Sequence, residues 1–539
     1  MAWNISEAIY RLGHSTVADR PALIHGGDEV SFKQLTERAS SFGSWLTSLE
    51  LPARAHIGHY MRNSKAYMES FTAAGLAGMT HVNVNYRYMD QELVDLCNGL
   101  DIRVLVYDAE FADRVAAIKE KLTATVAFVE VGDGDPVNKF AVSHEMLCQG
   151  DSTGFERSCS SDDLIIITTG GTTGLPKGVM WRHEDIWRKQ NLSTGSAMMA
   201  LKLTEHPATI EEHIANVLLM PEPTPFIPLS PLMHGAGLLM AILMLAQGIP
   251  VLTVPGKKFD ADLTLDLIKQ YRVGSMALVG DAFAIPLVEA LDKREDEHLL
   301  ASLGLMVSTG AALSEGYRES LLRHQPNLIV FDSLGSSEAS GFAMSTTEVG
   351  IFRPQPTTKV FDDEMREVVP GSDTIGIAYS GGYSPVGYYR QPEQSAETFV
   401  ELDGKRYVKT GDRCQVRADG LLVLLGRDST VINTGGEKVY TVEVERALLE
   451  HPSIGDALVV GLPHPRFGNM VVAVVEGHDL TEDNIDVEGI QALASKVLAD
   501  YKVPRKIFAI DSLQRADNGK ANYAFVKGFA QEQMESSSS

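Results

Sequence analysis

Cysteine is scarce in this chain. Four residues of 539 are cysteines, Cys97, Cys148, Cys159 and Cys414, and no two of them form a CxxC pair. Cysteines scattered in this way indicate neither a zinc site nor a disulfide framework. We therefore expect buried free thiols in a reducing compartment.

Positive charge and long apolar runs are also in short supply. The chain has 47 lysines and arginines against 71 aspartates and glutamates, a formal net charge of −24. This balance argues against nucleic acid or an anionic membrane as the main partner. The longest apolar run, Leu238 to Ala246, is far short of a membrane span and predicts a buried helix. Met1 to Tyr10 lacks the segments of a signal peptide. We expect a cytoplasmic protein without an integral membrane segment.

The composition that remains is ordinary for a globular protein, but the chain is too long for one core. Hydrophobic residues make up 44% of the sequence and charged residues 22%, and two or more domains are expected. From Asp162 onward, apolar runs alternate with helical patterns, which predicts an α/β fold with parallel-rich sheets flanked by helices. The predicted strands are 164–167, 250–254, 275–279, 303–307 and 328–331. The predicted helices are 32–48, 65–78, 263–271, 283–291 and 315–323.

The pattern changes near Leu421 to Arg427, where a strand is followed by a polar stretch. Beyond it we expect a helix with Thr441 as N-cap, strands at 457–460 and 470–475, and a helix over 487–501. These elements suffice for a small α+β domain. The predicted organisation is a large domain over 1–427, a small domain over 428–530 and a disordered tail over 531–539.

One loop stands out as a site. The stretch "TTGGTTGLPKGV" follows the buried strand 164–167 and combines glycines, hydroxyl side chains and Lys177. Glycines let successive backbone N–H groups approach an anion and form a nest for phosphate. A Walker loop requires glycine directly before the lysine and Ser or Thr directly after it, whereas here the order is Pro176-Lys177-Gly178. The loop therefore predicts phosphate binding outside the Walker class.

This loop resembles the phosphate-binding signature of the adenylate-forming superfamily, which includes acyl-CoA synthetases, nonribosomal peptide adenylation domains and firefly-type luciferases. Thr168 stands where the family has an aromatic residue, and Gly170 stands where it has a hydroxyl residue. The resemblance implies that ATP and AMP are bound by Thr168, Thr169, Gly170, Gly171, Thr172, Thr173 and Lys177.

Three further stretches match the same family in its order. "PLMHGAG" resembles the signature beside the acyl site, which makes His234 a candidate catalytic residue. "STGAALS" resembles the adenine-side loop, and "DSLGSSE" resembles Asn/Asp-x-Tyr-Gly-x-Thr-Glu, with Leu334 in place of the tyrosine. The nucleotide contacts implied by these two loops are Gly310, Ala311, Ala312, Asp332, Ser333, Leu334, Gly335, Ser336 and Ser337.

The resemblance gives two carboxylates a specific role in these loops. Asp332 would accept a hydrogen bond from the adenine amino group. Glu338 would hold Mg²⁺ against the triphosphate, a task suited to a carboxylate.

The C-terminal part carries the remaining family stretches. "YVKTGD" ends at Asp412, which would bind the ribose hydroxyls with help from Arg427. The hinge of relatives corresponds to Asp428 and Ser429, and "LQRADNGKAN" carries the catalytic lysine, Lys520. A loop on the coenzyme A side would be formed by Thr434, Gly435, Gly436, Glu437 and Lys438.

The activity implied by the resemblance is that of an ATP-dependent acyl-CoA synthetase. The acid is activated to acyl-AMP with release of pyrophosphate, and the acyl group then passes to coenzyme A as the small domain alternates. "VMWRHEDIW" and "NVNYRY" resemble the bacterial fatty-acid and sterol side-chain branch, which favours a medium-chain, long-chain or bulky hydrophobic acid.

Three alternatives remain open. The chain could load a carrier protein, or it could activate an aryl or amino acid, with Asp281 as a candidate partner for a substrate ammonium. It could also be a nucleotide-binding or acyl-binding protein that has lost turnover. A homodimer is compatible with each reading.

Overall fold

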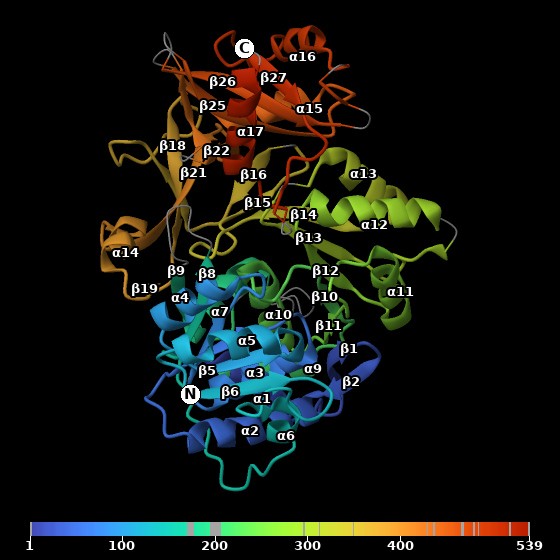
Figure 1. Cartoon of the computed structure of the whole chain (residues 1–539), viewed down its shortest axis with the longest axis vertical. Coiled ribbons are helices and arrows are strands. Elements are labelled where there is room, and N and C mark those ends of the chain that lie inside the picture. The colour runs from blue at the N-terminus through green and yellow to red at the C-terminus, as the bar shows by residue number, and fades with distance from the viewer. Residues whose placement is uncertain are drawn as a thin grey trace. The chain divides into compact units, whose positions relative to one another are not determined.

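The computed structural model describes residues 3–169, 177–194, 206–294, 297–311, 313–348, 350–427, 430–434, 437–464, 468–477, 480–482, 484–516 and 519–536. Contacts divide the chain into two compact units (Figure 1). The first unit comprises Met1–Gly341 and Gly381–Val408, and the second comprises Phe342–Ser380 and Lys409–Ser539. The border between these units differs from the domain boundary expected at residue 427. The boundary at residue 427 stays a prediction.

The first unit contains a sheet of eight described strands in the order β19-β9-β8-β4-β3-β5-β6-β7. Strands β4, β8, β3, β5, β6 and β7 pair in parallel, whereas β9 and β19 run antiparallel to their neighbours. The strands are β3 (His56–Tyr60), β4 (Thr80–Asn83), β5 (Ile102–Asp108), β6 (Ala127–Val131), β7 (Val142–Ser143), β8 (Leu164–Thr169), β9 (Lys177–Arg182) and β19 (Gly387–Tyr388).

A second series of strands in the first unit has the order β14-β13-β12-β10-β11-β1-β2. All neighbours in this series are parallel except β1 and β2. The bounds are β1 (Pro21–His25), β2 (Asp28–Ser31), β10 (Phe226–Pro228), β11 (Val251–Thr253), β12 (Ser275–Leu278), β13 (Leu305–Thr309) and β14 (Ile329–Leu334). Strand β20 (Phe399–Leu402) pairs with the start of β21 (Lys405–Val416). The parallel-rich α/β fold predicted from the sequence is confirmed.

Helices cover these sheets and follow the apolar periodicity of the sequence. Helix α2 has the predicted bounds, and α10 is the buried helix predicted from the long apolar run. The helices of this unit are α1 (Ile5–Leu12), α2 (Phe32–Ser48), α3 (Lys65–Leu76), α4 (Asp90–Gly99), α5 (Ala112–Ile118), α6 (His144–Cys148), α7 (His183–Thr194), α9 (Ile210–Leu219), α10 (Gly235–Ala246), α11 (Ala261–Tyr271), α12 (Asp281–Lys293), α13 (Glu315–His324) and α14 (Pro392–Thr398), with 3₁₀ turns η1 (Ala109–Phe111) and η2 (Lys119–Lys121).

The described strands of the second unit fall into two series. One has the order β17-β18-β21-β22-β16-β15, and the other has β24-β23-β26-β25 with β27 beside β26. Their strands are β15 (Ala343–Ser345), β16 (Ile351–Pro354), β17 (Thr358–Phe361), β18 (Ile375–Gly381), β22 (Leu422–Arg427), β23 (Ile432–Thr434), β24 (Glu437–Val439), β25 (Asp456–His464), β26 (Gly468–Glu476) and β27 (Lys506–Ala509). Two hydrophobic clusters lie wholly between Ile432 and Met534, so this part of the chain has a core of its own.

The helices of this small α+β part differ from expectation in three places. Thr441 is not the N-cap of α15 (Thr441–Leu449), because Tyr440 holds that position and the Thr441 hydroxyl donates to Thr430 Oγ1. Helix α16 (Val487–Ala494) ends before Tyr501. Helix α17 (Tyr523–Ser536) extends into the segment expected to be disordered, because Val526 and Ala530 are buried in the core.

The cysteines and the apolar helices relate to two expectations from the sequence. All four cysteines are free, with Cys97, Cys148 and Cys414 buried and Cys159 half-buried. Among the described residues, no helix has the length and apolar character needed to span a bilayer.

Candidate active site

The β8–β9 hairpin presents the base of the predicted phosphate loop. In its antiparallel register Thr169 pairs with Lys177, and Thr168 pairs with Gly178. Lys177, the first residue of β9, therefore lies opposite Thr169, the last residue of β8. The loop residues Gly170, Gly171, Thr172 and Thr173 lie outside the described residues.

Thr168 is tied into the sheet. Its backbone N–H donates to Asn83 Oδ1 at 2.8 Å, and its hydroxyl donates to the Asn83 carbonyl at 3.0 Å. A hydroxyl has a single hydrogen to donate, and a carbonyl can only accept. The Thr168 hydroxyl therefore holds β8 to β4 and leaves Thr169 as the described hydroxyl nearest the loop.

A tight turn follows β14 and carries Glu338. Ser336 Oγ accepts hydrogen bonds from the backbone N–H groups of Glu338 at 3.2 Å and Ala339 at 3.1 Å. Trp181 of β9 donates its indole N–H to the Ser337 carbonyl at 2.8 Å. This bond joins the turn to the hairpin that carries Lys177, so the two predicted loops belong to one locality of the first unit.

Glu338 has a partner that the sequence did not indicate. The Tyr388 hydroxyl donates to Glu338 Oε1 at 2.9 Å, and the Lys177 ammonium lies 4.8 Å from the centre of the Tyr388 ring. Burial and the neighbouring Glu338 carboxylate raise the pKa of Tyr388, so its hydroxyl remains a donor at neutral pH. Tyr388 is 50 residues from Glu338 in sequence, so no short-range pattern predicts the contact between them. Locally, the sequence shows only a pair of tyrosines before "RQPE".

Asp332 is half-buried at the end of β14 and already contacts a cation. Its Oδ2 lies 2.6 Å from Arg318 Nη2, and Arg318 also donates to the Val330 carbonyl at 2.7 Å. Burial raises the pKa of Asp332, and the Arg318 charge opposes that rise. The carboxylate is thus oriented by Arg318 before any ligand is present.

The predicted adenine-side loop begins beside this carboxylate. Ser308 pairs with Asp332 and Thr309 with Ser333 in the parallel β13–β14 register. Gly310 has φ of +89°, a conformation that residues with a Cβ rarely adopt. Ala311 follows it, whereas Ala312 lies outside the described residues. The two strand ends therefore bring both predicted adenine loops to the same edge.

His234 is half-buried at the N-cap position of α10 and makes no side-chain capping bond. The segment before it is anchored by three side chains. Asn63 bonds the Leu232 N–H, Tyr67 bonds the Leu232 carbonyl at 3.1 Å, and Asn83 donates to the Met233 carbonyl. At Gly235, the direction of a Cβ leads to Ile167 and Ser337, so the start of α10 lies beside both loops.

Asp412 and Arg427 are two neighbouring predicted residues of the second unit. They are direct partners in the antiparallel β21–β22 register, and Arg427 Nε lies 3.4 Å from Asp412 Oδ1. Burial raises the pKa of Asp412, and Arg427 opposes the rise. Half of the Arg427 side chain is exposed, so it is available to a ligand.

The remaining predicted residues of the second unit are partly described. Lys520 is exposed, in a turn where the Ala516 N–H donates to the Lys520 carbonyl. Gln514 has φ of +50°, which a proline could not adopt, so the backbone here departs from the family's Leu-Pro pattern. Thr434 is buried and pairs with Glu437, and Lys438 follows in β24. Gly435, Gly436, Asp428, Ser429 and Asn518 lie outside the described residues.

The surroundings of Glu338 fit a magnesium ion. The half-buried carboxylate accepts from Tyr388 on one oxygen. Mg²⁺ is typically held by one or two carboxylates, with waters and substrate phosphates completing the octahedron. One oriented carboxylate close to a phosphate-type loop meets this requirement.

Two protein-family models match this chain. Residues 13–389 match the AMP-binding enzyme family, and residues 443–520 match the AMP-binding enzyme C-terminal domain. A medium/long-chain-fatty-acid–CoA/3-oxocholest-4-en-26-oate–CoA ligase of Mycolicibacterium smegmatis is 36% identical, covering 99% of this chain and 97% of its own. A 3-oxocholest-4-en-26-oate–CoA ligase of Rhodococcus rhodochrous is 33% identical, covering 98% and 96%.

A solved structure has the same fold. The anthranilate CoA ligase AuaEII in complex with anthranoyl-AMP matches with a TM-score of 0.82 and 23% identity. The match covers 99% of this chain and 98% of that one. At this level of identity the likeness concerns the fold alone.

Proposed function

The chain belongs to the AMP-binding enzyme family, and from this membership we propose that it is an ATP-dependent, AMP-forming acyl-CoA ligase. The observation that carries the proposal is the connected set Lys177, Tyr388 and Glu338, which joins a phosphate-type loop to an oriented carboxylate. The likeness over nearly the full length of two ligases supports the same activity.

We propose that the acid is a medium-chain, long-chain or bulky hydrophobic carboxylic acid. The two relatives are named for fatty acids and for 3-oxocholest-4-en-26-oate, a sterol side-chain acid. The amino acid alternative is disfavoured by Asp281, whose carboxylate accepts from both the backbone N–H and the hydroxyl of Ser314. The Asp281 carboxylate already accepts two hydrogen bonds from Ser314. We therefore assign it a structural role and not the binding of a substrate ammonium.

In the first step, one carboxylate oxygen of the acid attacks the α-phosphorus of ATP, and pyrophosphate leaves. This brings two anions together, so positioned positive charge is the main requirement of the site. We propose that Lys520 supplies this charge at the α-phosphate and that Thr169, the glycine–threonine loop and Lys177 receive the pyrophosphate. Asp332 binds the adenine amino group, and Asp412 with Arg427 binds the ribose.

Glu338 is the proposed ligand for Mg²⁺, which would neutralise charge on the phosphates when bound. Tyr388 would orient the Glu338 carboxylate by the bond to Oε1, and the Ser336 turn would fix its backbone. These two contacts are made by the protein alone, so the carboxylate is ordered before substrate arrives.

In the second step the thiol of coenzyme A attacks the acyl carbon, a thioester forms and AMP leaves. Lys520 and the loop Thr434 to Lys438 serve different steps. We propose that the small domain turns about Asp428 and Ser429, which first presents Lys520 and then the loop. Alternation of this kind lets one enzyme use two incompatible arrangements of groups.

The proposed location is the cytoplasm, where four free thiols are stable. The proposed partners are the acid, ATP and coenzyme A, and assembly as a homodimer is a further proposal.

Pyrophosphate release tests the proposal when measured against a panel of acids with and without coenzyme A. We expect release with hydrophobic acids and a thioester only when coenzyme A is present. Acid-dependent release without a thioester would instead identify a carrier-protein ligase. ATP binding without release would identify a binding protein.

A further inference from the structure

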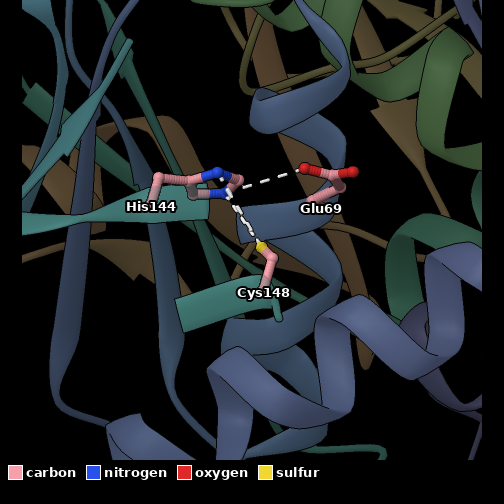
Figure 2. Close-up of side chains that lie close together, drawn as sticks. All are labelled: Glu69, His144 and Cys148. Carbon is pink, nitrogen blue, oxygen red and sulfur yellow. Dashed lines mark hydrogen bonds and ion pairs between the residues drawn. The ribbon is translucent and has the colours of Figure 1, made fainter. Parts of the chain in front are cut away.

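Figure 2 shows a buried cluster of Glu69, His144 and Cys148 in the first unit. None of the three residues is proposed for catalysis. His144 and Cys148 are four residues apart on α6 and point to the same side of the helix. Glu69 comes from the middle of α3. The side chains of Glu69 and His144 are at most 3% exposed, and Cys148 is 4% exposed.

The three side chains offer one sulfur, one nitrogen and one oxygen at close range. Cys148 Sγ lies 3.5 Å from His144 Nε2, and His144 Nε2 lies 3.8 Å from Glu69 Oε2. One ligand atom of each residue lies within 4.8 Å of the other two. For a tetrahedral zinc ion with the usual bond lengths, ligand atoms are about 3.4 to 3.6 Å apart. Cys148 Sγ also lies 3.8 Å from His144 Nδ1, so the sulfur lies beside the imidazole ring. A rotation of that ring would turn Nε2 toward an ion shared with Sγ and Glu69.

The next layer of contacts fits a metal site as well. Arg38 of α2 donates to both oxygens of Glu69, at 2.7 and 3.3 Å, and its Nη2 also reaches Glu145 at 2.6 Å. Ligating carboxylates are commonly oriented by hydrogen bonds of this kind. Arg38 also lines a surface pocket with Glu37 and Lys65, so this side chain extends from the surface to Glu69.

The charges balance when a divalent ion is added. A zinc ion, the Cys148 thiolate and the Glu69 carboxylate sum to zero, as do Arg38 and Glu145. Cysteine binds zinc as the thiolate, so binding of the ion releases the proton of the Cys148 thiol.

We propose that Glu69, His144 and Cys148 form a zinc-binding site that ties α6 to α3. Thiolate and imidazole are ligands that zinc favours. Among the described residues no fourth ligand belongs to the cluster, and a water completes the tetrahedron. The site is separate from the proposed ligase function, so either can fail without the other.

Metal binding can be measured on the full-length protein after treatment with a chelator. Zinc alone should bind at one ion per chain and release one proton per ion. Cobalt(II) alone should give a thiolate-to-cobalt charge-transfer band, which zinc then removes. This band needs no variant, so it tests the site even where a substitution disturbs folding.

Matched serine substitutions identify the thiolate. Cys148→Ser should lose the cobalt band and weaken zinc binding by at least about 100-fold. Cys97→Ser, at a buried cysteine in a different core cluster, should keep both. Absence of the band in the wild-type protein would overturn the proposal, and so would a band that persists in Cys148→Ser.

Discussion

Replacing Tyr388 with phenylalanine removes one hydroxyl and keeps the ring. The ring is 6% exposed and packs in the core of the first unit, so we expect the fold to survive. The substitution removes the hydrogen bond to Glu338 Oε1 and a longer contact, 3.4 Å, with Thr398 Oγ1. The Glu338 carboxylate then has more freedom to turn away from the orientation proposed for magnesium.

The expected size of the effect follows from the charge on the acceptor. Hydrogen bonds to charged groups contribute about 1.5–3 kcal/mol, and each 1.4 kcal/mol is a factor of about ten. If the bond is maintained in the transition state, Tyr388→Phe should slow acyl-AMP formation about 10- to 150-fold. The magnesium concentration for half-maximal rate should rise, because an unoriented ligand binds the ion less tightly.

The assay is pyrophosphate release as a function of magnesium concentration, without coenzyme A. Tyr389→Phe is a matched control, because the Tyr389 hydroxyl donates to a different carboxylate, Asp101, at 2.6 Å. Tyr389→Phe should leave the magnesium dependence unchanged. Equal magnesium dependence in Tyr388→Phe and the wild-type protein would refute the reasoning about Glu338.

Three further predictions concern the second unit. Lys520→Ala should abolish acyl-AMP formation but spare thioester formation from supplied acyl-AMP; equal loss in separate assays of the two half-reactions would contradict its assigned role. Ser429→Pro should spare adenylation and slow thioester formation, since proline restricts φ; unchanged rates in both assays would remove Ser429 as the pivot. Burial raises the pKa of Glu445 to about 7. Between about pH 4.5 and 7 the folded state therefore keeps a proton that the unfolded state has released, and this contribution to stability declines as pH rises. Glu445→Gln should lack that decline and gain stability relative to the wild type from about pH 5 to 7.5 in urea titrations; a parallel pH dependence would contradict this.

Local patterns predicted the elements whose determinants lie within the element. Helix α2 begins where expected because Ser31 and Gln34 form a capping box. Strands β8, β11, β12 and β13 were predicted because they are short apolar runs with buried residues on both faces. At Thr441 the same reasoning was wrong, because the preceding Tyr440 takes the extended conformation of the N-cap.

Motifs propose site residues, whereas contacts between distant segments need the fold. Lys177, Asp332 and Asp412 are proposed from their neighbours in sequence and stay predictions, whereas Tyr388 reaches Glu338 only through the fold. The Cys148 environment was missed for the same reason. Its helical partner His144 is close in sequence, but Glu69 comes from another helix.

The central claim is that the carboxylate of the acid attacks the α-phosphorus of ATP. An acid labelled with ¹⁸O in both carboxylate oxygens tests this directly, with ATP and coenzyme A present and the products analysed by mass spectrometry. We predict that one labelled oxygen appears in AMP and that the thioester keeps the other. Label found in inorganic phosphate together with ADP, or AMP formed without label, would contradict the account.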